Sequence, residues 1–174
     1  MIRILPRPQH IEEEREDCFL ITIARITMDS QLPIRSIFFM HHSLQSSLKK
    51  SSGIELLIDR RSSGAHKGIV LCMSEEAGIT RENKKEKEAY RLEITPEGAS
   101  VCAAEKEGLF NGVQTLRQLI IQYGSSLPCL YIEDYPALSV RGWFMDVTRG
   151  RIPKMTYLKE LADRCSLYKI NQLH

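Results

Sequence analysis

The last quarter of the chain places the strongest constraint on the fold. Residues 139–147 read as a strand, 155–168 as an amphipathic helix and 171–174 as the beginning of a second strand, after which the printed sequence ends. Strand, helix and strand in this order form a βαβ unit, whose parallel strands need a wider sheet with both faces covered. We therefore expect residues 136–174 to be the first unit of a larger β/α domain.

Residues 1–135 show a different pattern, in which hairpins dominate and strict βαβ alternation is absent. Six or seven strands are predicted, the clearest of them in a hairpin over residues 90–104. Two amphipathic helices are predicted, one over residues 34–50 and one from about residue 105 to a Gly124 cap. This pattern predicts an α+β domain with both helices on one face of a mixed or mainly antiparallel sheet.

Local features make this prediction more specific. The segments Ile11–Arg15 and Phe19–Ile23 read as two short strands joined by a charged link, which predicts a hairpin. The apolar run Gly68–Ser74 predicts a central strand buried on both faces. Gly108 and Gly112, inside the second helix, indicate a close approach to a neighbour. The apolar stripe expected on the first helix is Ile34, Ile37, Phe38, His41, Leu44 and Leu48.

Charge and composition exclude several classes of protein. The 24 basic and 22 acidic side chains are interspersed, so no single-sign face is predicted and nucleic acid is not an expected partner. A hydrophobic content of 43% and a charged content of 26% are typical of globular proteins. No segment approaches the roughly 18 apolar residues of a membrane span, and the N-terminus lacks the apolar run of a signal peptide. We therefore expect a cytoplasmic protein without a membrane partner.

Cysteine and histidine spacing indicates neither a metal site nor a cofactor. The sequence has five widely spaced cysteines without a CxxC pair: Cys18, Cys72, Cys102, Cys129 and Cys165. This spacing predicts reduced core thiols rather than a zinc site or a disulfide framework. His41 and His42 are adjacent on the first helix and point about 100° apart, without HExxH spacing. A structural role is therefore expected for both, and no metal ion is expected.

Short blocks along the whole chain match a pattern shared by one enzyme family. They are Ile4–Gln9, Ala89–Ile94, Gly108–Leu119, Asp134–Pro136, Arg141–Gly142, Asp146–Arg149 and Lys169–His174. With these residues the chain resembles the family 20 glycoside hydrolases, the β-N-acetylhexosaminidases. The related family 84 enzymes share the front domain, but the segment Trp143–Val147 departs from their pattern.

The resemblance implies a non-catalytic α+β domain over residues 1–135, followed by the beginning of a catalytic (β/α)₈ barrel over residues 136–174. In this family the 2-acetamido carbonyl of the substrate attacks the anomeric carbon. A Glu protonates the departing oxygen, and the Asp before it orients the acetamido group. That Asp-Glu pair lies on a later strand, and no residue of this chain matches it. We expect an N-terminal fragment of a β-N-acetylhexosaminidase, acting on terminal N-acetylhexosamine residues, which is inactive alone.

Arg141 is the residue to which the resemblance assigns contact with substrate, because the family's arginine before glycine on the first barrel strand binds sugar hydroxyls. A guanidinium presents a rigid fork of donors suited to vicinal hydroxyls. From the residues alone, the alternative is a structural role, either capping a strand or pairing with Asp134. Asp146 and Arg149 are expected to form a structural ion pair, since Asp146 has the opposite parity to Arg141. His174 matches the histidine of the family's Asn-x-x-His motif.

Two other functions remain open from the sequence. The chain could be a scaffold or interaction module, because an unfinished barrel exposes an apolar strand and helix face and invites self-association. It could also be an independent carbohydrate-binding domain. Trp143 is the sole tryptophan and falls in the predicted barrel strand rather than on a visible sugar-stacking platform.

Overall fold

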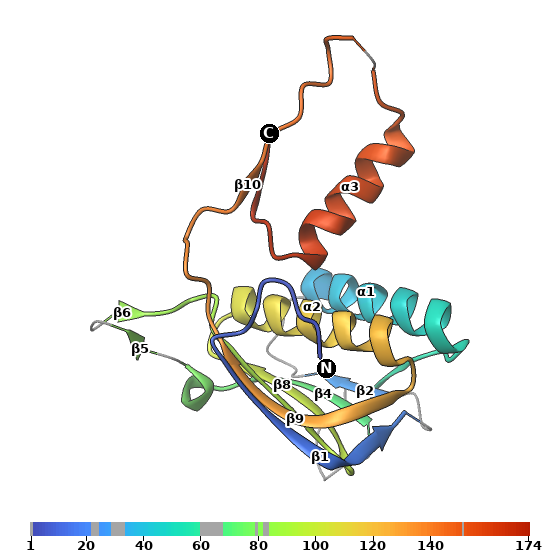
Figure 1. The fold of residues 1–174 in the computed structure, drawn as a ribbon, viewed down its shortest axis with the longest axis vertical. Helices are drawn as coiled ribbons and strands as arrows, with labels where there is room; N and C mark the ends of the chain where they lie inside the picture. The colour runs from blue at the N-terminus through green and yellow to red at the C-terminus, as the bar shows by residue number, and fades with distance from the viewer. Residues whose placement is uncertain are drawn as a thin grey trace. The chain divides into compact units, whose positions relative to one another are not determined.

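A computed structural model describes residues 2–21, 25–28, 34–59, 68–78, 80–81, 84–150 and 152–174. The chain divides into two compact units, Met1–Tyr135 and Pro136–His174, called unit 1 and unit 2 below (Figure 1). No helix among the described residues combines the length and the hydropathy of a membrane span.

Unit 1 is built on a seven-stranded mixed sheet with the order β1-β9-β7-β8-β4-β2-β3. Its strands are β1 (His10–Leu20), β2 (Arg25–Met28), β3 (Leu57–Asp59), β4 (Gly68–Met73), β7 (Tyr90–Thr95), β8 (Gly98–Ala103) and β9 (Ser126–Asp134). Neighbours pair antiparallel from β1 to β8 and parallel from β8 to β3. The pair of β8 and β4 is therefore the seam between two halves of the sheet, and the predicted hairpin over residues 90–104 is confirmed.

Small elements connect the large strands. The 3₁₀ turn η1 (Glu75–Ala77) follows β4, and Ser74 caps it by accepting a hydrogen bond from the amide of Glu76. Strands β5 (Thr80–Arg81) and β6 (Lys84–Lys85) then form a separate antiparallel pair.

Two helices, α1 (Ile34–Ser52) and α2 (Lys106–Tyr123), lie together on one face of the sheet (Figure 1). The predicted close approach of α2 to the sheet is confirmed. A Cβ at Gly108 would lie 2.0 Å from the carbonyl oxygen of Ala89, and one at Gly112 would lie 2.4 Å from Cγ1 of Val101. A side chain would therefore require backbone to move at Gly108 and buried side chains to move at Gly112. The predicted α+β arrangement, a mixed sheet with two helices on one face, is confirmed for unit 1.

The first strand differs from the prediction. The segments Ile11–Arg15 and Phe19–Ile23 do not form a hairpin with each other, because one strand, β1, contains the first, continues to Leu20 in the second and pairs with β9. Residues 22–24 lie outside the described part of the chain. The pairing shifts register between Glu13 and Cys18. A charged run need not end a strand at the edge of a sheet, because one side of an edge strand is open to water.

The buried face of α1 differs from the predicted apolar stripe. Leu44 is fully buried, but Phe38 is 67% exposed, and the side chain of Ile37 lies outside the described part. Ser47 is buried and its Oγ accepts a 2.8 Å hydrogen bond from Nε of Arg117 on α2. Apolar spacing could not identify this face, because the helix buries small polar residues against a polar neighbour.

Strand β4 is central, as predicted, but only one of its faces is fully buried. Ile69 and Leu71 are each 1% exposed, whereas Val70 and Cys72 are half-buried on the opposite face. The prediction of burial on both faces was wrong because the two helices cover the same side of the sheet (Figure 1). The other side is lined by polar residues of the neighbouring strands.

The cysteines also require a correction. A disulfide joins Cys72 of β4 to Cys102 of β8, with the two Cα atoms 4.8 Å apart. The prediction of reduced thiols was therefore wrong for this pair, because only the sheet register brings together cysteines separated by 30 positions. Cys129 and Cys165 are buried thiols outside this disulfide, as expected. The side chain of Cys18 lies outside the described part of the structure.

Unit 2 contains two short parallel strands joined by a helix. They are β10 (Gly142–Trp143), α3 (Met155–Leu167) and β11 (Gln172–Leu173). The strand predicted over residues 139–147 is reduced to two paired residues, while the helix agrees with the prediction to within one residue. The order and the parallel pairing make unit 2 a βαβ unit.

Candidate functional site

Arg141 comes directly before β10 and joins three segments of unit 2. Its Nε donates to the carbonyl of Lys169 at 2.7 Å, and its Nη1 donates to the carbonyl of Leu138 at 2.6 Å. Its own amide donates to Oδ1 of Asn171 at 2.9 Å, and its carbonyl accepts from the amide of Asn171 at 2.9 Å. These bonds give the half-buried Arg141 a structural role at the start of β10. Contact with a sugar stays a prediction.

Asn171 is a functional candidate that the sequence reasoning did not single out. Besides its contact with Arg141, its Nδ2 donates to the carbonyl of Ser139 at 2.8 Å. The side chain thus links the segment before β10 to the segment before β11. The Asn-x-x-His motif contains this residue, and it is the one signal in the sequence that could have identified it.

Asp146 organises the turn that follows β10. Its Oδ1 accepts hydrogen bonds from the amide of Thr148 at 2.8 Å, from Oγ1 of Thr148 at 2.9 Å and from the amide of Arg149 at 3.2 Å. These bonds lower the pKa of the carboxyl group, with the amide of Thr148 as the largest cause. Nε of Arg149 lies 3.7 Å from Oδ2, and its side chain is 91% exposed. The turn therefore depends more on Thr148 than on the predicted ion pair.

His174 extends the parallel pairing beyond β11. Its amide donates to the carbonyl of Trp143 at 2.9 Å, and its carbonyl accepts from the amide of Met145 at 2.8 Å. Its imidazole is exposed, with Nε2 lying 3.5 Å from Oε1 of Gln172. His174 and Asp146 follow their strands, whereas Arg141 precedes its strand. In a β/α barrel, active sites form at the ends where His174 and Asp146 lie.

A buried polar network ties together three elements of unit 1. The hydroxyl of Tyr90 lies 2.6 Å from Oγ1 of Thr115 on α2 and donates to Oδ2 of Asp134 at 2.8 Å. Oδ1 of Asp134 accepts from the amide of Gln9 at 3.2 Å. Burial, followed by the charge of Asp134, raises the pKa of Tyr90 well above its usual value. This network is structural, because Tyr90 is completely buried and no substrate can reach its hydroxyl.

The block Gly108–Leu119, which carries much of the family resemblance, also serves the fold. Gln118 on α2 accepts from the amide of Leu5 at 2.9 Å and donates to the carbonyl of Leu5 at 2.7 Å. One turn later, Gln122 accepts from the amide of Arg3 at 3.1 Å and donates to its carbonyl. The two side-chain amides therefore hold the backbone of the N-terminal segment along α2.

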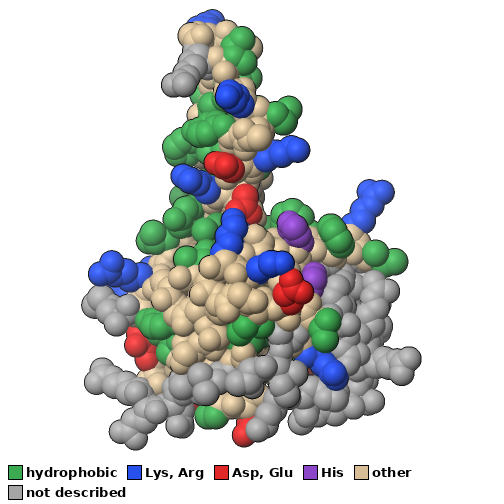
Figure 2. All heavy atoms as spheres, turned by 90° about the vertical axis from the view of Figure 1, so that its right-hand side faces the viewer, with side chains coloured by type: hydrophobic (Ala, Val, Ile, Leu, Met, Phe, Trp, Pro, Cys, Tyr) green, Lys and Arg blue, Asp and Glu red, His purple; other side chains and the backbone are tan. Residues whose placement is uncertain are grey.

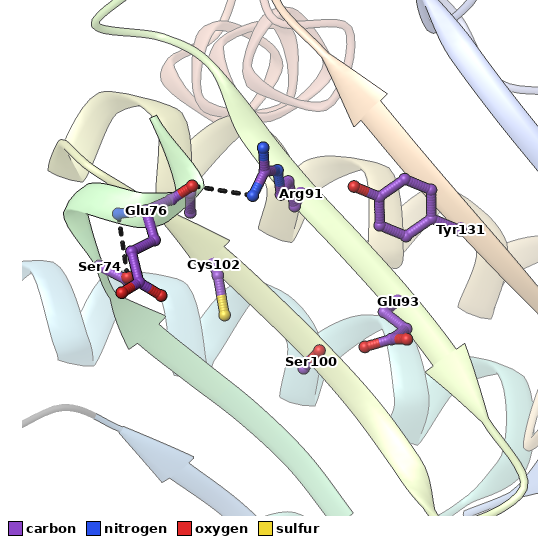
Figure 3. A pocket seen from close by; sticks show the side chains of 8 residues that line it. Ser74, Glu76, Arg91, Glu93, Ser100, Cys102 and Tyr131 are labelled. Carbon is purple, nitrogen blue, oxygen red and sulfur yellow. Dashed lines mark hydrogen bonds between the residues drawn. The ribbon is translucent and has the colours of Figure 1, made fainter. Parts of the chain in front are cut away.

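A shallow hollow of about 210 Å³ lies on the uncovered face of the sheet, at the seam near η1 (Figure 3). Arg91 occupies one side, where its Nη1 donates to the carbonyl of Glu76 at 2.8 Å and its Nε pairs with Oε1 of Glu133 at 2.7 Å. Tyr131 also donates to Glu133, and burial and this bond raise the pKa of Tyr131 to about 12. The sequence reasoning missed the hollow because its lining comes from four separate segments.

The two adjacent histidines make contacts that fit the expected structural role. Nε2 of His41 lies 3.2 Å from the carbonyl oxygen of Leu56, and the ring of His42 stacks on Phe38 with centroids 6.2 Å apart. Within the ranges that the structure describes, no three His, Cys, Asp or Glu residues cluster closely enough to hold a metal ion.

The fold defines a class of protein in which an α+β domain is followed by a βαβ unit. The family model described as glycosyl hydrolase family 20, domain 2, matches residues 1–135. Because this match covers most of the chain, the chain belongs to glycosyl hydrolase family 20.

Relatives in sequence and structure agree with this assignment. The chain is 29% identical to a β-N-acetylhexosaminidase from Cellulomonas fimi over 177 residues, covering 99% of this chain and 34% of that protein. It is 40% identical to a β-hexosaminidase from Akkermansia muciniphila over 92 residues, covering 51% and 18%. The N-acetyl-β-hexosaminidase of Streptomyces plicatus has a similar structure, with a TM-score of 0.78, 28% identity, and coverage of 98% of this chain and 33% of that one. The chain therefore spans about a third or less of these relatives.

Proposed function

We propose that this chain is the N-terminal part of a β-N-acetylhexosaminidase that hydrolyses terminal N-acetylhexosamine residues. In this proposal, residues 1–135 form the non-catalytic α+β domain and residues 136–174 form the first unit of a catalytic (β/α)₈ barrel. The observation that carries the proposal is the parallel β10–α3–β11 unit directly after a family 20 domain. The relative from Cellulomonas fimi, which matches 99% of the chain, is named a β-N-acetylhexosaminidase.

Unit 2 supports this proposal because its apolar surface is not covered. Its exposed large hydrophobic residues are Leu138, Val140, Trp143, Phe144, Val147, Ile152, Met155, Tyr157, Tyr168 and Leu173. Figure 2 shows hydrophobic side chains along the surface of this unit. Two paired residues in each strand cannot bury such a surface, and parallel sheets are normally covered on both faces. Further β/α units would supply the missing strands and helices.

In the proposed mechanism the acetamido group of the substrate is the nucleophile, and a Glu outside this chain protonates the departing oxygen. Arg141 would hold hydroxyls of the sugar that is cleaved. Its Nε and Nη1 already bond to backbone carbonyls, so the guanidinium is oriented before substrate arrives. Asp146 and Arg149 would shape the loop after β10, and His174 would stand at the end of β11. Residues 1–174 alone would then bind sugar poorly and catalyse nothing, because the acid lies elsewhere.

Substitution of Arg141 in the full-length enzyme tests this role. For Arg141→Ala we expect kcat/KM on a chromogenic N-acetylglucosaminide to fall about 100-fold, which corresponds to about 3 kcal/mol for lost charge-assisted hydrogen bonds. Arg141→Lys should recover little, because an ammonium lacks the fork. Arg149→Ala is the control, and its kcat/KM should stay within a few-fold of the wild-type value. Unchanged kcat/KM for Arg141→Ala, or turnover by residues 1–174 alone, would contradict the proposal.

The exposed apolar residues of unit 2 favour a second candidate function, an interaction module that associates with itself or docks on another subunit. In that case residues 1–174 should sediment as dimers or larger species at high concentration, and Phe144→Ser should shift them toward monomers. Phe144 is 79% exposed, so this change should not disturb the fold. A monomer at every concentration would argue against this function.

The compartment is part of the same proposal. From the sequence we expect a cytoplasmic protein, but the disulfide of unit 1 favours a different compartment. Disulfides persist in oxidising compartments and are rare in the cytosol. The Cys72–Cys102 bond therefore favours an exported enzyme over a cytoplasmic one.

A further inference from the structure

Cys72 and Cys102 lie where the two halves of the sheet meet. They are direct partners in the parallel register of β4 and β8. This pair is the seam at which the antiparallel half, β1-β9-β7-β8, meets the parallel half, β4-β2-β3. A covalent bond at the seam therefore joins the two halves of the sheet, in addition to the backbone pairing of β4 with β8 and the shared hydrophobic core.

The pair also differs in accessibility from the buried thiols Cys129 and Cys165. Cys72 and Cys102 are half-buried on the face of the sheet that the helices leave uncovered. Figure 3 shows Cys102 on β8, on the floor of the hollow between Ser74 and Arg91. Cys129, in contrast, is fully buried. A small thiol can therefore approach the disulfide without unfolding the domain, whereas Cys129 is shielded.

We propose that Cys72 and Cys102 form a reversible thiol–disulfide exchange site, open to small dithiols in the folded protein, that locks and unlocks the seam of the sheet. A dithiol thiolate attacks one sulfur, a mixed disulfide forms, and the other cysteine leaves as a thiolate that takes up a proton. The second thiol of the reagent then closes into a cyclic disulfide and releases the protein. The protein gains two electrons and two protons, and the dithiol loses them.

Charges around the hollow determine which thiols react fastest. Glu76 and Glu93 line it and are exposed, while Arg91 is paired with Glu133. The net charge facing Cys102 is therefore negative, which repels anionic attacking groups at this short range. After correction for intrinsic nucleophilicity, which falls with the pKa of the thiol, the rate per thiolate should be a few-fold higher for cysteamine than for 2-mercaptoethanol and lowest for 2-mercaptoethanesulfonate. Both Glu93→Gln and 0.5 M salt should reduce the differences in reduction rate between the three thiols.

The test labels the folded chain with iodoacetamide and identifies the modified cysteines by mass spectrometry. After oxidation by a glutathione redox buffer, we expect Cys72 and Cys102 to stay unlabelled. With dithiothreitol under native conditions both should be labelled, while Cys129 stays protected and the circular dichroism is unchanged. Cys72→Ser should expose Cys102 to label without reductant, and Cys129→Ser, the matched control, should leave Cys102 protected.

Two results would overturn the proposal. Labelling of Cys72 and Cys102 in the oxidised wild-type protein would show that the bond does not form. Labelling only after denaturation would show an inert crosslink rather than an exchange site. As a second measurement on the wild-type chain, reduction should lower the melting temperature by about 10 °C, because the crosslink restricts the unfolded chain. None of these outcomes depends on the proposed hydrolase activity.

Discussion

The two units contain similar apolar residues and use them differently. In unit 1 most of the buried hydrophobic residues form one continuous cluster, from Ile4 in the N-terminal segment to Ile132 in β9. In unit 2 the one hydrophobic residue classed as buried, among those that the structure describes, is Cys165. A βαβ pattern is therefore sufficient to define a helix and two paired strands, but burial requires partner elements that unit 2 does not contain.

Polar residues show the same difference. The hydroxyl of Tyr90 and the carboxylate of Asp134 satisfy each other inside unit 1, away from water. In unit 2, Arg141 and Asn171 bond to backbone groups near the surface and hold the ends of short strands. Packing and polar bonds in the interior thus stabilise unit 1, whereas side-chain hydrogen bonds around the strand ends hold unit 2 together.

The largest expected effect compares one leucine from each unit. Leu116 is fully buried and Leu138 is 68% exposed. Leu116→Ala should lower the free energy of unfolding by about 3 kcal/mol, because it leaves a cavity in a packed core. Leu138→Ala should change it by less than about 0.5 kcal/mol. Urea unfolding followed by circular dichroism measures both, and fluorescence of Trp143 reports on unit 2. Equal losses for the two variants would show that unit 2 is packed as tightly as unit 1.

A smaller effect is expected at the buried hydroxyl of Tyr90. Tyr90→Phe removes the donor to Asp134 and should destabilise unit 1 by about 2 kcal/mol at pH 7. The raised pKa of Tyr90 also predicts a pH dependence. Stability should be unaffected below pH 10 and should fall above it by about 1.4 kcal/mol per pH unit, because the unfolded chain loses this proton first.

The control for the alkaline loss is Tyr131, whose pKa is raised to about 12. Tyr131→Phe should leave the slope that comes from Tyr90 in place, whereas Tyr90→Phe should remove it. Urea titrations at a series of pH values from 8 to 12 would measure both variants. Tyr131 contributes its own loss between pH 10 and about 12, so a slope in Tyr90→Phe as steep as that of the wild-type chain would show that Tyr90 does not contribute.

The smallest effect is expected in the turn after β10. Asp146 should titrate below its usual pKa of 3.8, because Thr148 and Arg149 donate hydrogen bonds to its carboxylate. Any stability that this turn contributes should be present at neutral pH and should disappear as the pH falls through the lowered pKa. Thr148→Val removes the hydroxyl donor and should raise the pKa of Asp146 part of the way toward its usual value. Carbon NMR of the carboxyl group measures this, with Thr156→Val as the control, and an unchanged pKa would contradict the turn geometry.

Much of the fold could be predicted from local pattern. The hairpin over residues 90–104, the helix α2 with its close-approach glycines and the helix α3 all have a period or a cap within a few residues. The same holds for the residues of the candidate site, since Arg141, Asp146 and His174 lie in short recognisable blocks. Asn171 was missed because its importance depends on the bonds it makes to residues about thirty positions away.

The failed predictions all depend on which distant segments become neighbours. A charged run was read as a break, although β1 continues through it as an edge strand beside β9. The buried side of α1 includes Ser47, which bonds to Arg117 of α2. Neither result is visible in the spacing of apolar residues.

The sequence by itself determined the local elements, their order and the family to which the chain belongs, because periodicity and short motifs act over a few residues. Only the tertiary structure decided the sheet order, the bond between Cys72 and Cys102 and the hollow beside it. These depend on register between strands far apart in the chain. Register is selected by the packing energy of the whole domain rather than by any one segment.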